Sequence, residues 1–510
     1  MVKKSLKKYE FFKTQNKTLI SDYGDTILHK DIYDDINHLF FDLNCLIHPC
    51  ARGLNDENEI IDKILNEIHK LIKYTRVKDT IYIAIDGIAP KMKMRQQRMR
   101  RHKSALERKY NTESSWNTNA ISPGTKFMNI LNIRLRKKFS CLENIILDDS
   151  DNRGEGEHKI LHYILNNNLK GKICIYGLDA DLIQLSLVSH KPNIVLLRET
   201  TDYNIENTDS EYIYLKIDSL KKHLLESFHL QRIVKESIII DDYIFMCFLL
   251  GNDFMNHIPS LSLRYGGHDI LLDTYSKLQD RYSGYFRLID REIPNIIHMT
   301  FFKEFISELS SLESEMISKT IMIRKRQREK ISNQYYNDYQ DFKKFILEHG
   351  ENENSIDDGY LSLEDIYRFQ CNTTSDKDSI KKMIENLPIL ASDKEFKLYK
   401  SLQCDSEECQ DYLDTLVHTT HYYFNKCVNW RYSSSKSKGP LLTNLCKYIP
   451  NYKIDITRNN KEYSNKEQLE YIFPKDSHHL HEYDISGKEY KMIVDLKFNR
   501  YMWECHLEFI

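Results

Sequence analysis

The chain has 510 residues, of which 41% are hydrophobic and 29% charged, a balance typical of folded proteins rather than of disordered chains. The length allows roughly three to four average domains or one large composite core. A formal net charge of −2 argues against a protein that binds polyanions over its whole surface. We expect no membrane span, because the longest apolar stretch near the middle runs only from Tyr243 to Leu250.

The 11 cysteines are scattered and form no C-x-x-C pair. This pattern favours reduced thiols in an intracellular protein and gives no sign of a zinc site. The N-terminal segment is basic and lacks the apolar centre of a secretory signal. We therefore expect a location in the cytoplasm or the nucleus.

Apolar runs alternate with helical patterns over the first 200 residues. The patterns predict strands at 37–42, 80–86, 143–147, 172–176 and 193–197. They predict helices at 57–74, 91–109 and 156–167, and one more that ends at 187. Such alternation indicates an α/β fold with a mostly parallel sheet. Ligands of these sheets bind at the carboxyl ends of the strands.

The second half of the chain follows a different pattern. Residues 325–360 are polar and lose the periodicity, which indicates a connecting insertion. We expect an N-terminal domain at 1–324, this polar linker at 325–360, and a mixed, largely helical C-terminal block at 361–510.

Charge is distributed unevenly along the N-terminal half. Residues 91–109 carry nine Lys or Arg and one acid, a local charge of +8. Residues 148–157 carry five acids and one Arg, a local charge of −4. In a nearly neutral protein, this asymmetry indicates one polyanion site and one cation site.

Acidic residues recur at strand ends and helix starts. The candidates are Asp42, Asp86, Glu155, Glu157, Asp179, Asp181 and Asp253. Any one of them could simply cap a helix. Parallel neighbouring strands, however, would bring all seven to one sheet edge, where mutual repulsion disfavours their ionisation. We therefore expect them to bind Mg²⁺ or Mn²⁺, and two ions about 3.5–4 Å apart could support phosphodiester cleavage.

The basic segment predicts an anion pocket beside these acids. Lys93, Gln97, Arg100 and Arg101 recur at i, i+4, i+7 and i+8, which places them on one helical stripe. Arginine offers two parallel hydrogen bonds to a phosphate, and glutamine can donate one more. The alternative is a solvated charged helix.

Six ordered motifs resemble those of the XRN family of 5′-to-3′ exoribonucleases. They are FFDLNCLIHPC (40–50), IAIDGIAPKMKMRQQRMRR (83–101), ISPGTKFM (121–128), GEGEHKI (154–160), IYGLDADLI (175–183) and FLLGNDFMNHIPSL (248–261). Weaker similarity continues to the end of the chain and excludes the polar insertion. The resemblance implies a PIN-like 5′-nuclease core, completed by the C-terminal block, without the extra C-terminal domains of the large cytoplasmic members.

The resemblance also implies an activity and a set of site residues. The seven acids would be catalytic metal ligands, and the basic stripe would hold a 5′-monophosphate. His48 would stack on a base together with Trp430 or Tyr432, because the family has two tryptophans in a segment where this chain has one. Each of His48 and Trp430 could instead belong to the core. The implied reaction is processive 5′-to-3′ hydrolysis of single-stranded RNA.

Two other functions stay open, and one feature departs from the family. A flap-endonuclease-like enzyme would use the same metals on branched DNA, although its helix-hairpin-helix glycine pattern is not visible here. An inactive RNA-binding scaffold would be expected to lack some of the acids. The chain begins with Met1-Val2-Lys3-Lys4-Ser5 and not with the family's usual start, which leaves duplex unwinding open.

Overall fold

The structure is a computed structural model. It describes residues 28–29, 33, 35–110, 116–139, 142–177, 179–200, 211–228, 230–231, 233–282, 286–334, 336–349, 360–372, 406–436, 439–454, 458–485, 492–495 and 506–509. Among these residues, no helix combines the length and the apolar character needed to cross a bilayer. The eight cysteines within this part of the chain are free thiols.

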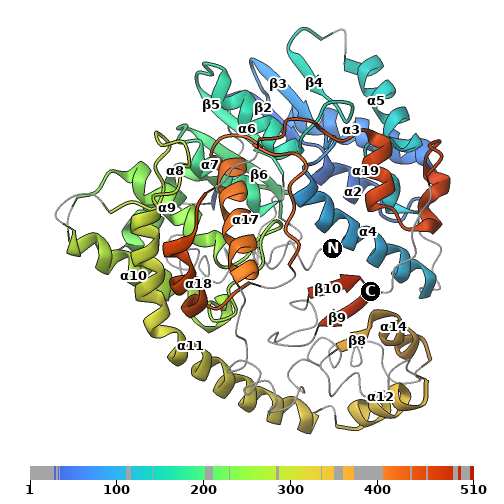
Figure 1. The fold of residues 1–510 in the computed structure, drawn as a ribbon. Helices are drawn as coiled ribbons and strands as arrows, with labels where there is room; N and C mark the ends of the chain where they lie inside the picture. The colour runs from blue at the N-terminus through green and yellow to red at the C-terminus, as the bar shows by residue number, and fades with distance from the viewer. Residues whose placement is uncertain are drawn as a thin grey trace.

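Seven strands form the central sheet. They are β1 (Leu28–His29), β2 (Ile36–Asp42), β3 (Thr80–Ala84), β4 (Ile145–Asp148), β5 (Lys172–Tyr176), β6 (Ile194–Glu199) and β7 (Tyr212–Lys216). Their order is β1-β7-β6-β5-β2-β3-β4 (Figure 1). Strands β2 to β6 are parallel, β7 is antiparallel to β6, and β1 is antiparallel to β7. The predicted α/β fold with a mostly parallel sheet is confirmed.

Helices cover both faces of this sheet. Successive residues of β2 point to opposite sides, so Phe40 lies in one core and Phe41 in the other. The core around Phe40 includes residues of α6 (Gly156–Asn166), α7 (Ala180–Val188), α8 (Ile217–Ser227) and α9 (Glu236–Phe248). The core around Phe41 includes residues of α2 (Asn44–Cys50), α3 (Glu57–Thr75) and α5 (Lys126–Phe139). Burial on both faces explains why the strands are apolar throughout.

The strand order reverses direction between β2 and β5. From β2 the chain adds β3 and then β4 on one side, and it returns to place β5 and β6 on the other side. Ligands of open α/β sheets bind at such a switch point, in the crevice outside the carboxyl ends of the strands. The switch point therefore marks where the site is to be sought.

The C-terminal half is largely helical, as predicted. Its helices are α10 (Gly267–Arg281), α11 (Met299–Gln334), α12 (Tyr336–His349), α14 (Leu363–Asn372), α17 (Ser406–Phe424), α18 (Leu442–Tyr448) and α19 (Asn465–Ile472). A small antiparallel sheet adds β8 (Tyr360–Ser362), β9 (Met492–Asp495) and β10 (His506–Phe509). Helix α17 contacts α7, while α14 and α19 contact α4 (Lys91–Tyr110), so this half packs against elements that carry the predicted site (Figure 1).

Helices run through much of the segment predicted as a polar linker. Residues 325–334 continue α11, a 36-residue helix, and 336–349 form α12. These helices were not predicted because polar residues dominate the segment and leave no clear apolar period in the sequence. The domain boundaries themselves stay predictions.

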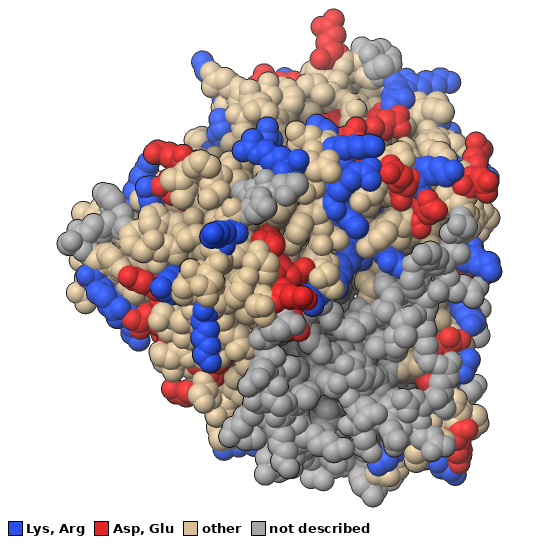
Figure 2. All heavy atoms as spheres, in the orientation of Figure 1, with Lys and Arg blue, Asp and Glu red and all other residues tan. Residues whose placement is uncertain are grey.

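Charge on the visible surface is mixed. Figure 2 shows Lys and Arg interspersed with Asp and Glu on the face in view, in line with the net charge of −2. Because charges of both signs are mixed over this face, we expect any anion site to be formed by a few neighbouring Lys or Arg side chains.

Candidate active site

The seven predicted carboxylates gather at the carboxyl edge of the sheet. Asp42 is the last residue of β2, and Asp86 follows β3 by two positions. The other five lie at the starts of α6 and α7 or in the loop after α9, namely Glu155, Glu157, Asp179, Asp181 and Asp253. Asp42, Glu155 and Glu157 are each repelled by neighbouring acids, among them Asp86, Asp179 and Asp181. Asp253 joins the group through Lys93, which pairs with both Asp253 and Glu155.

Two groups of possible ligand atoms overlap within this cluster. Single oxygens of Glu157, Asp179 and Asp181 all lie within 4.8 Å of one another. One atom each from Glu155, Glu157 and His158 meets the same limit. The two groups share Glu157, so a carboxylate stands between two places where a cation could bind.

The pair formed by Asp42 and Asp86 is held by neighbouring donors. Asp86 Oδ2 accepts a hydrogen bond from Asn44 Nδ2 (2.8 Å), and Asp86 Oδ1 accepts one from the Gly156 amide (2.7 Å). Cys45 Sγ donates to Asp42 Oδ2 (3.0 Å). A side chain at Gly156 would place its Cβ 2.9 Å from Asp42 Oδ1, so any other residue here would force the Asp42 carboxylate or the start of α6 to shift.

Lys93 of α4 lies inside the acidic cluster. Its Nζ is 2.5 Å from Glu155 Oε2 and 3.0 Å from Asp253 Oδ2. Burial would lower the pKa of Lys93, but the surrounding carboxylates outweigh burial and hold this pKa well above its usual range. The phosphate contact predicted for Lys93 stays a prediction, because its partners in this structure are acids.

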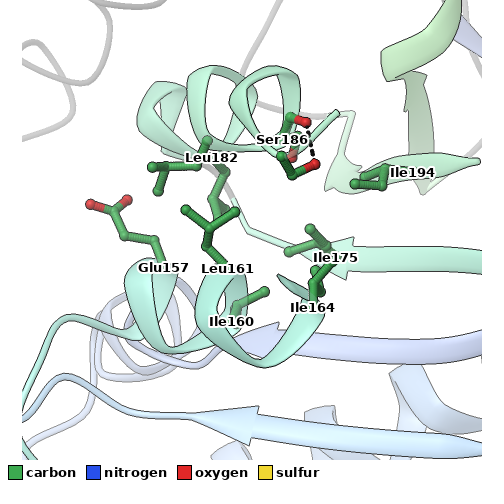
Figure 3. Close-up of a pocket in the computed structure, with 10 residues that line it drawn as sticks. Glu157, Ile160, Leu161, Ile164, Ile175, Leu182, Ser186 and Ile194 are labelled. Carbon is green, nitrogen blue, oxygen red and sulfur yellow. Dashed lines mark hydrogen bonds between the residues drawn. The ribbon is translucent and has the colours of Figure 1, made fainter. Parts of the chain in front are cut away.

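Burial makes the remaining negative charge costly. Burial, followed by repulsion from Asp86, raises the pKa of Asp42 to about 8. Burial, with Asp181 and Asp179 next in importance, raises the pKa of Glu157 well above its usual range. Figure 3 shows the setting of Glu157, whose carboxylate lies at one end of a pocket lined mainly by Ile and Leu of α6, α7, β5 and β6. A divalent cation with oxygen ligands would remove this repulsion, and the donor set suits Mg²⁺ or Mn²⁺.

The stripe on α4 contains two arginines in different settings. Arg101 is buried, and it donates from Nε to Ser122 Oγ (2.8 Å) and from Nη2 to the Ile121 carbonyl (3.3 Å). Burial, with Arg100 adding to it, lowers the pKa of Arg101 well below its usual range. Arg100 is half-buried, and no hydrogen bond or ion pair of its side chain is seen within the described part of the chain. Gln97 is buried beside them. The pair of cations is therefore short of negative charge, which an anion would supply.

The three candidate stacking rings are placed differently. His48 lies in the last turn of α2, where burial and then Arg100 lower its pKa to about 3, so that the ring is uncharged. Trp430 is buried, with the Arg153 guanidinium 5.2 Å from the centre of its ring. Tyr432 stacks on His418 with ring centres 3.9 Å apart. Both C-terminal rings thus have partners within the protein, and which of them meets a base stays a prediction.

Several residues of the site were not singled out from the sequence. Asn44 lies two positions after Asp42, so the motif around Asp42 carried a signal that could have identified it. His158 follows Glu157 directly, in a motif where only the acids were chosen. Tyr422 donates its hydroxyl to Glu155 Oε1 (2.7 Å) from 267 residues away, and no spacing rule predicts that contact.

Comparison with known families assigns this chain to one of them. A family model described as the XRN 5′-3′ exonuclease N-terminus matches residues 6–200, and one described as the Xrn1 helical domain matches residues 234–397. The chain belongs to the XRN family of 5′-to-3′ exoribonucleases. The predicted family is therefore confirmed, whereas the predicted PIN-like class of the α/β core stays a prediction.

Individual XRN relatives cover different parts of the chain. Human 5′-3′ exoribonuclease 1 is 26% identical over 524 residues, which cover 88% of this chain and 29% of the relative. Kluyveromyces lactis 5′-3′ exoribonuclease 2 is 32% identical over 310 residues, which cover 47% of this chain and 31% of the relative. The chain spans about a third of the length of the first curated relatives it matches.

One solved structure with a related arrangement is the T5 D15 protein co-crystallised with metal ions. It is 11% identical, the match covers 56% of this chain and 88% of that chain, and the TM-score is 0.30. A likeness this distant carries no conclusion about the site.

Proposed function

We propose that this chain is a Mg²⁺- or Mn²⁺-dependent 5′-to-3′ exoribonuclease that hydrolyses single-stranded RNA processively from a 5′-monophosphate. The observation that carries this proposal is the buried carboxylate cluster at the switch point of the sheet, with the cationic stripe of α4 directly beside it. Membership in the XRN family supports the same reaction. The intracellular location expected from the thiols also stays a prediction.

The acids would hold the metal, and their surroundings fix them for that purpose. Two divalent ions, when bound, would supply an activated water and stabilise the leaving oxygen. Asp42 ends β2 and Asp86 follows β3, while Glu157, Asp179 and Asp181 lie at the starts of α6 and α7, so all five lie at the carboxyl edge of the sheet. The Asn44 amide and the start of α6 restrain Asp86, and the start of α7 restrains Asp179, so little rearrangement of these two acids is needed when a cation arrives.

The stripe on α4 would hold the terminal phosphate and set the register of cleavage. Arg100 and Arg101 would offer positive charge to a phosphate, since the hydrogen bonds of Arg101 seen in the described part of the chain go to neutral groups. Because the helix begins beside the acids, a phosphate bound here would hold the next phosphodiester near the metal ligands. The uncharged ring of His48, close to both arginines, is placed to stack on the first base.

Selectivity for the 5′ end tests this proposal. We expect the wild-type chain to hydrolyse RNA with a 5′-monophosphate faster than RNA with a 5′-hydroxyl, triphosphate or cap, and we expect EDTA to stop hydrolysis. A 5′-hydroxyl would leave the arginines unpaired and the scissile bond misplaced. The measurement compares initial rates on the four 5′ ends and on matching single-stranded and flap DNA.

The variant Arg100→Ala should narrow the gap between monophosphate and hydroxyl ends. Arg134→Ala is the matched control, because Arg134 pairs with Asp62 at the surface on α5 and α3. Equal wild-type rates on RNA with 5′-phosphate and 5′-hydroxyl ends would contradict the assignment of the α4 stripe as a 5′-phosphate pocket. Preferential cleavage of flap DNA would favour the flap-endonuclease reading, and RNA binding with no hydrolysis under any metal would favour the scaffold.

A further inference from the structure

We propose that the group of Glu155, Glu157 and His158 is a metal position with a nitrogen ligand, which takes an ion of the Mn²⁺ to Zn²⁺ class in preference to Mg²⁺. The inference deepens the proposed function and rests on it through Glu157, the carboxylate shared with the all-oxygen group. The two metal positions would then differ in their ligands, since one would have only oxygens and the other would have oxygens and a nitrogen.

The placement of the His158 ring carries this inference. His158 is 2% exposed, and neither of its ring nitrogens has a hydrogen-bond partner among the described residues. One of them lies within 4.8 Å of carboxylate oxygens from both Glu155 and Glu157. A neutral imidazole has one N–H and one lone pair, and buried polar atoms in proteins almost always have partners. A metal ion shared with the two carboxylates would engage the lone pair.

Two tyrosines of α17 hold this ring in place. The ring centre of Tyr422 is 3.8 Å from that of His158 with the planes inclined by 30°, and Tyr423 approaches edge-on at 5.9 Å. The Tyr422 hydroxyl also donates to Glu155 Oε1 (2.7 Å). One residue therefore orients both the nitrogen and one of the oxygens, as residues around metal sites commonly do.

Charge and ligand type separate this position from its neighbour. The group of Glu157, Asp179 and Asp181 offers only oxygens, which suit Mg²⁺, whereas imidazole favours ions further along the transition series. The ammonium group of Lys93 lies 2.5 Å from Glu155 Oε2, so a positive charge is already favoured at this point. An incoming ion would take over that neutralisation, and Lys93 would keep its second partner, Asp253.

Pulsed electron paramagnetic resonance of bound Mn²⁺ tests the inference, because electron spin echo modulation reports nitrogen ligands directly. The full chain is loaded with Mn²⁺ at natural isotope abundance and after labelling with ¹⁵N-histidine. The variant His158→Gln is compared with His162→Gln as a matched control. His162 lies one turn further along α6, with its ring nitrogen 3.3 Å from the Asn425 carbonyl.

We expect ¹⁴N modulation from the wild type, its replacement by ¹⁵N modulation on labelling, its loss in His158→Gln and its retention in His162→Gln. Mn²⁺ affinity at this position should fall at least about tenfold in His158→Gln. Bound Mn²⁺ without histidine modulation, or modulation that survives in His158→Gln, would overturn the inference. If His158→Gln does not fold, the isotope comparison in the wild type still decides.

Hydrolysis of RNA in Mg²⁺, measured in parallel on the wild type, tests the proposed function separately. Active enzyme whose Mn²⁺ lacks histidine coupling would reject only the nitrogen ligand. Inactive enzyme with histidine-coupled Mn²⁺ would reject only the nuclease. A chain that binds no Mn²⁺ would reject both.

Discussion

Asp179 caps a helix and also belongs to one of the candidate metal-binding groups. Its Oδ1 accepts a hydrogen bond from the Asp181 amide (3.2 Å) at the start of α7, which is ordinary capping. Its carboxylate also lies in one ligand group with Glu157 and Asp181. Capping uses one oxygen, so the cap fixes the side chain while the other oxygen stays available to a cation. The two interpretations that the sequence left open are therefore compatible.

This double role leads to a prediction for Asp179→Asn. Asparagine caps a helix about as well as aspartate, so α7 and RNA binding should be kept, whereas the charge that binds metal is lost. We expect the rate of RNA hydrolysis to fall below about a tenth of the wild-type rate, in line with other losses of catalytic groups. Initial rates and RNA affinity are measured together.

The matched control is Asp62→Asn on α3, whose carboxylate pairs with Arg134 at the surface. Its hydrolysis rate should equal that of the wild type. Retention of more than a tenth of the rate by Asp179→Asn would count against its place among the metal ligands.

At the scale of elements, α4 joins the acidic cluster to the rest of the protein. Its first turn places Lys93 among the acids, and two turns later Arg101 binds the segment at Ile121 and Ser122. The two adjacent arginines therefore differ. Arg101 forms hydrogen bonds within the protein, whereas no hydrogen bond or ion pair of the Arg100 side chain is seen among the described residues. In the proposed function, the helix would therefore use neighbouring side chains for two purposes, Arg101 for structure and Arg100 for anion binding.

We predict that Arg101→Ala destabilises the fold and Arg100→Ala does not. Removing Arg101 leaves a buried carbonyl and hydroxyl short of donors, which should lower the free energy of unfolding by about 2–3 kcal/mol. Arg100→Ala should stay within about 0.5 kcal/mol of the wild type. Urea unfolding of both variants measures the difference. Equal stability of the two variants would contradict the structural assignment of Arg101.

The sequence predicted the acids at the edge of the sheet, but it did not predict the side chains that pack onto that edge. The acids follow strands or open helices in chain order, so a parallel sheet brings them together by topology alone. The contacts that complete the site join distant segments, such as Lys93 to Asp253, 160 residues apart, and Tyr422 to Glu155. Strand β7 was not predicted either, because its antiparallel pairing with β6 is a tertiary contact. No local pattern encodes these contacts.

At the scale of the whole molecule, buried carboxylates link stability to protons and to metal. The pKa of Asp42 rises from 3.8 to about 8 on folding. Between those values the folded state holds a proton that the unfolded state has released, so the free energy of unfolding falls as pH rises. A bound cation would take the place of that proton, and its stabilising effect should therefore grow with pH.

Thermal melts at pH 7 and pH 8 measure this linkage. In EDTA the protein should be less stable at pH 8 than at pH 7, and Asp42 should account for about 1 kcal/mol of the difference in the free energy of unfolding. This pH range lies above the ordinary titration range of histidine, so histidines should contribute little. Mg²⁺ should raise Tm more at pH 8 than at pH 7. Asp42→Asn removes the group and should flatten the dependence in EDTA. A Tm in EDTA that rises from pH 7 to pH 8 would contradict the buried, protonated Asp42.

In the proposed function, the carboxylate cluster hydrolyses RNA from the 5′ end with the help of divalent metal. The most direct measurement follows one single-stranded RNA with a 5′-monophosphate, labelled at its 5′ end in one sample and at its 3′ end in another, in Mg²⁺. We predict that the 5′ label is released immediately as a mononucleotide and that the 3′-labelled RNA is degraded without visible intermediates. We predict no release of the 5′ label in EDTA, and none by the Asp179→Asn variant. Internal fragments at first cleavage, shortening from the 3′ end, or the same release in EDTA would contradict the account.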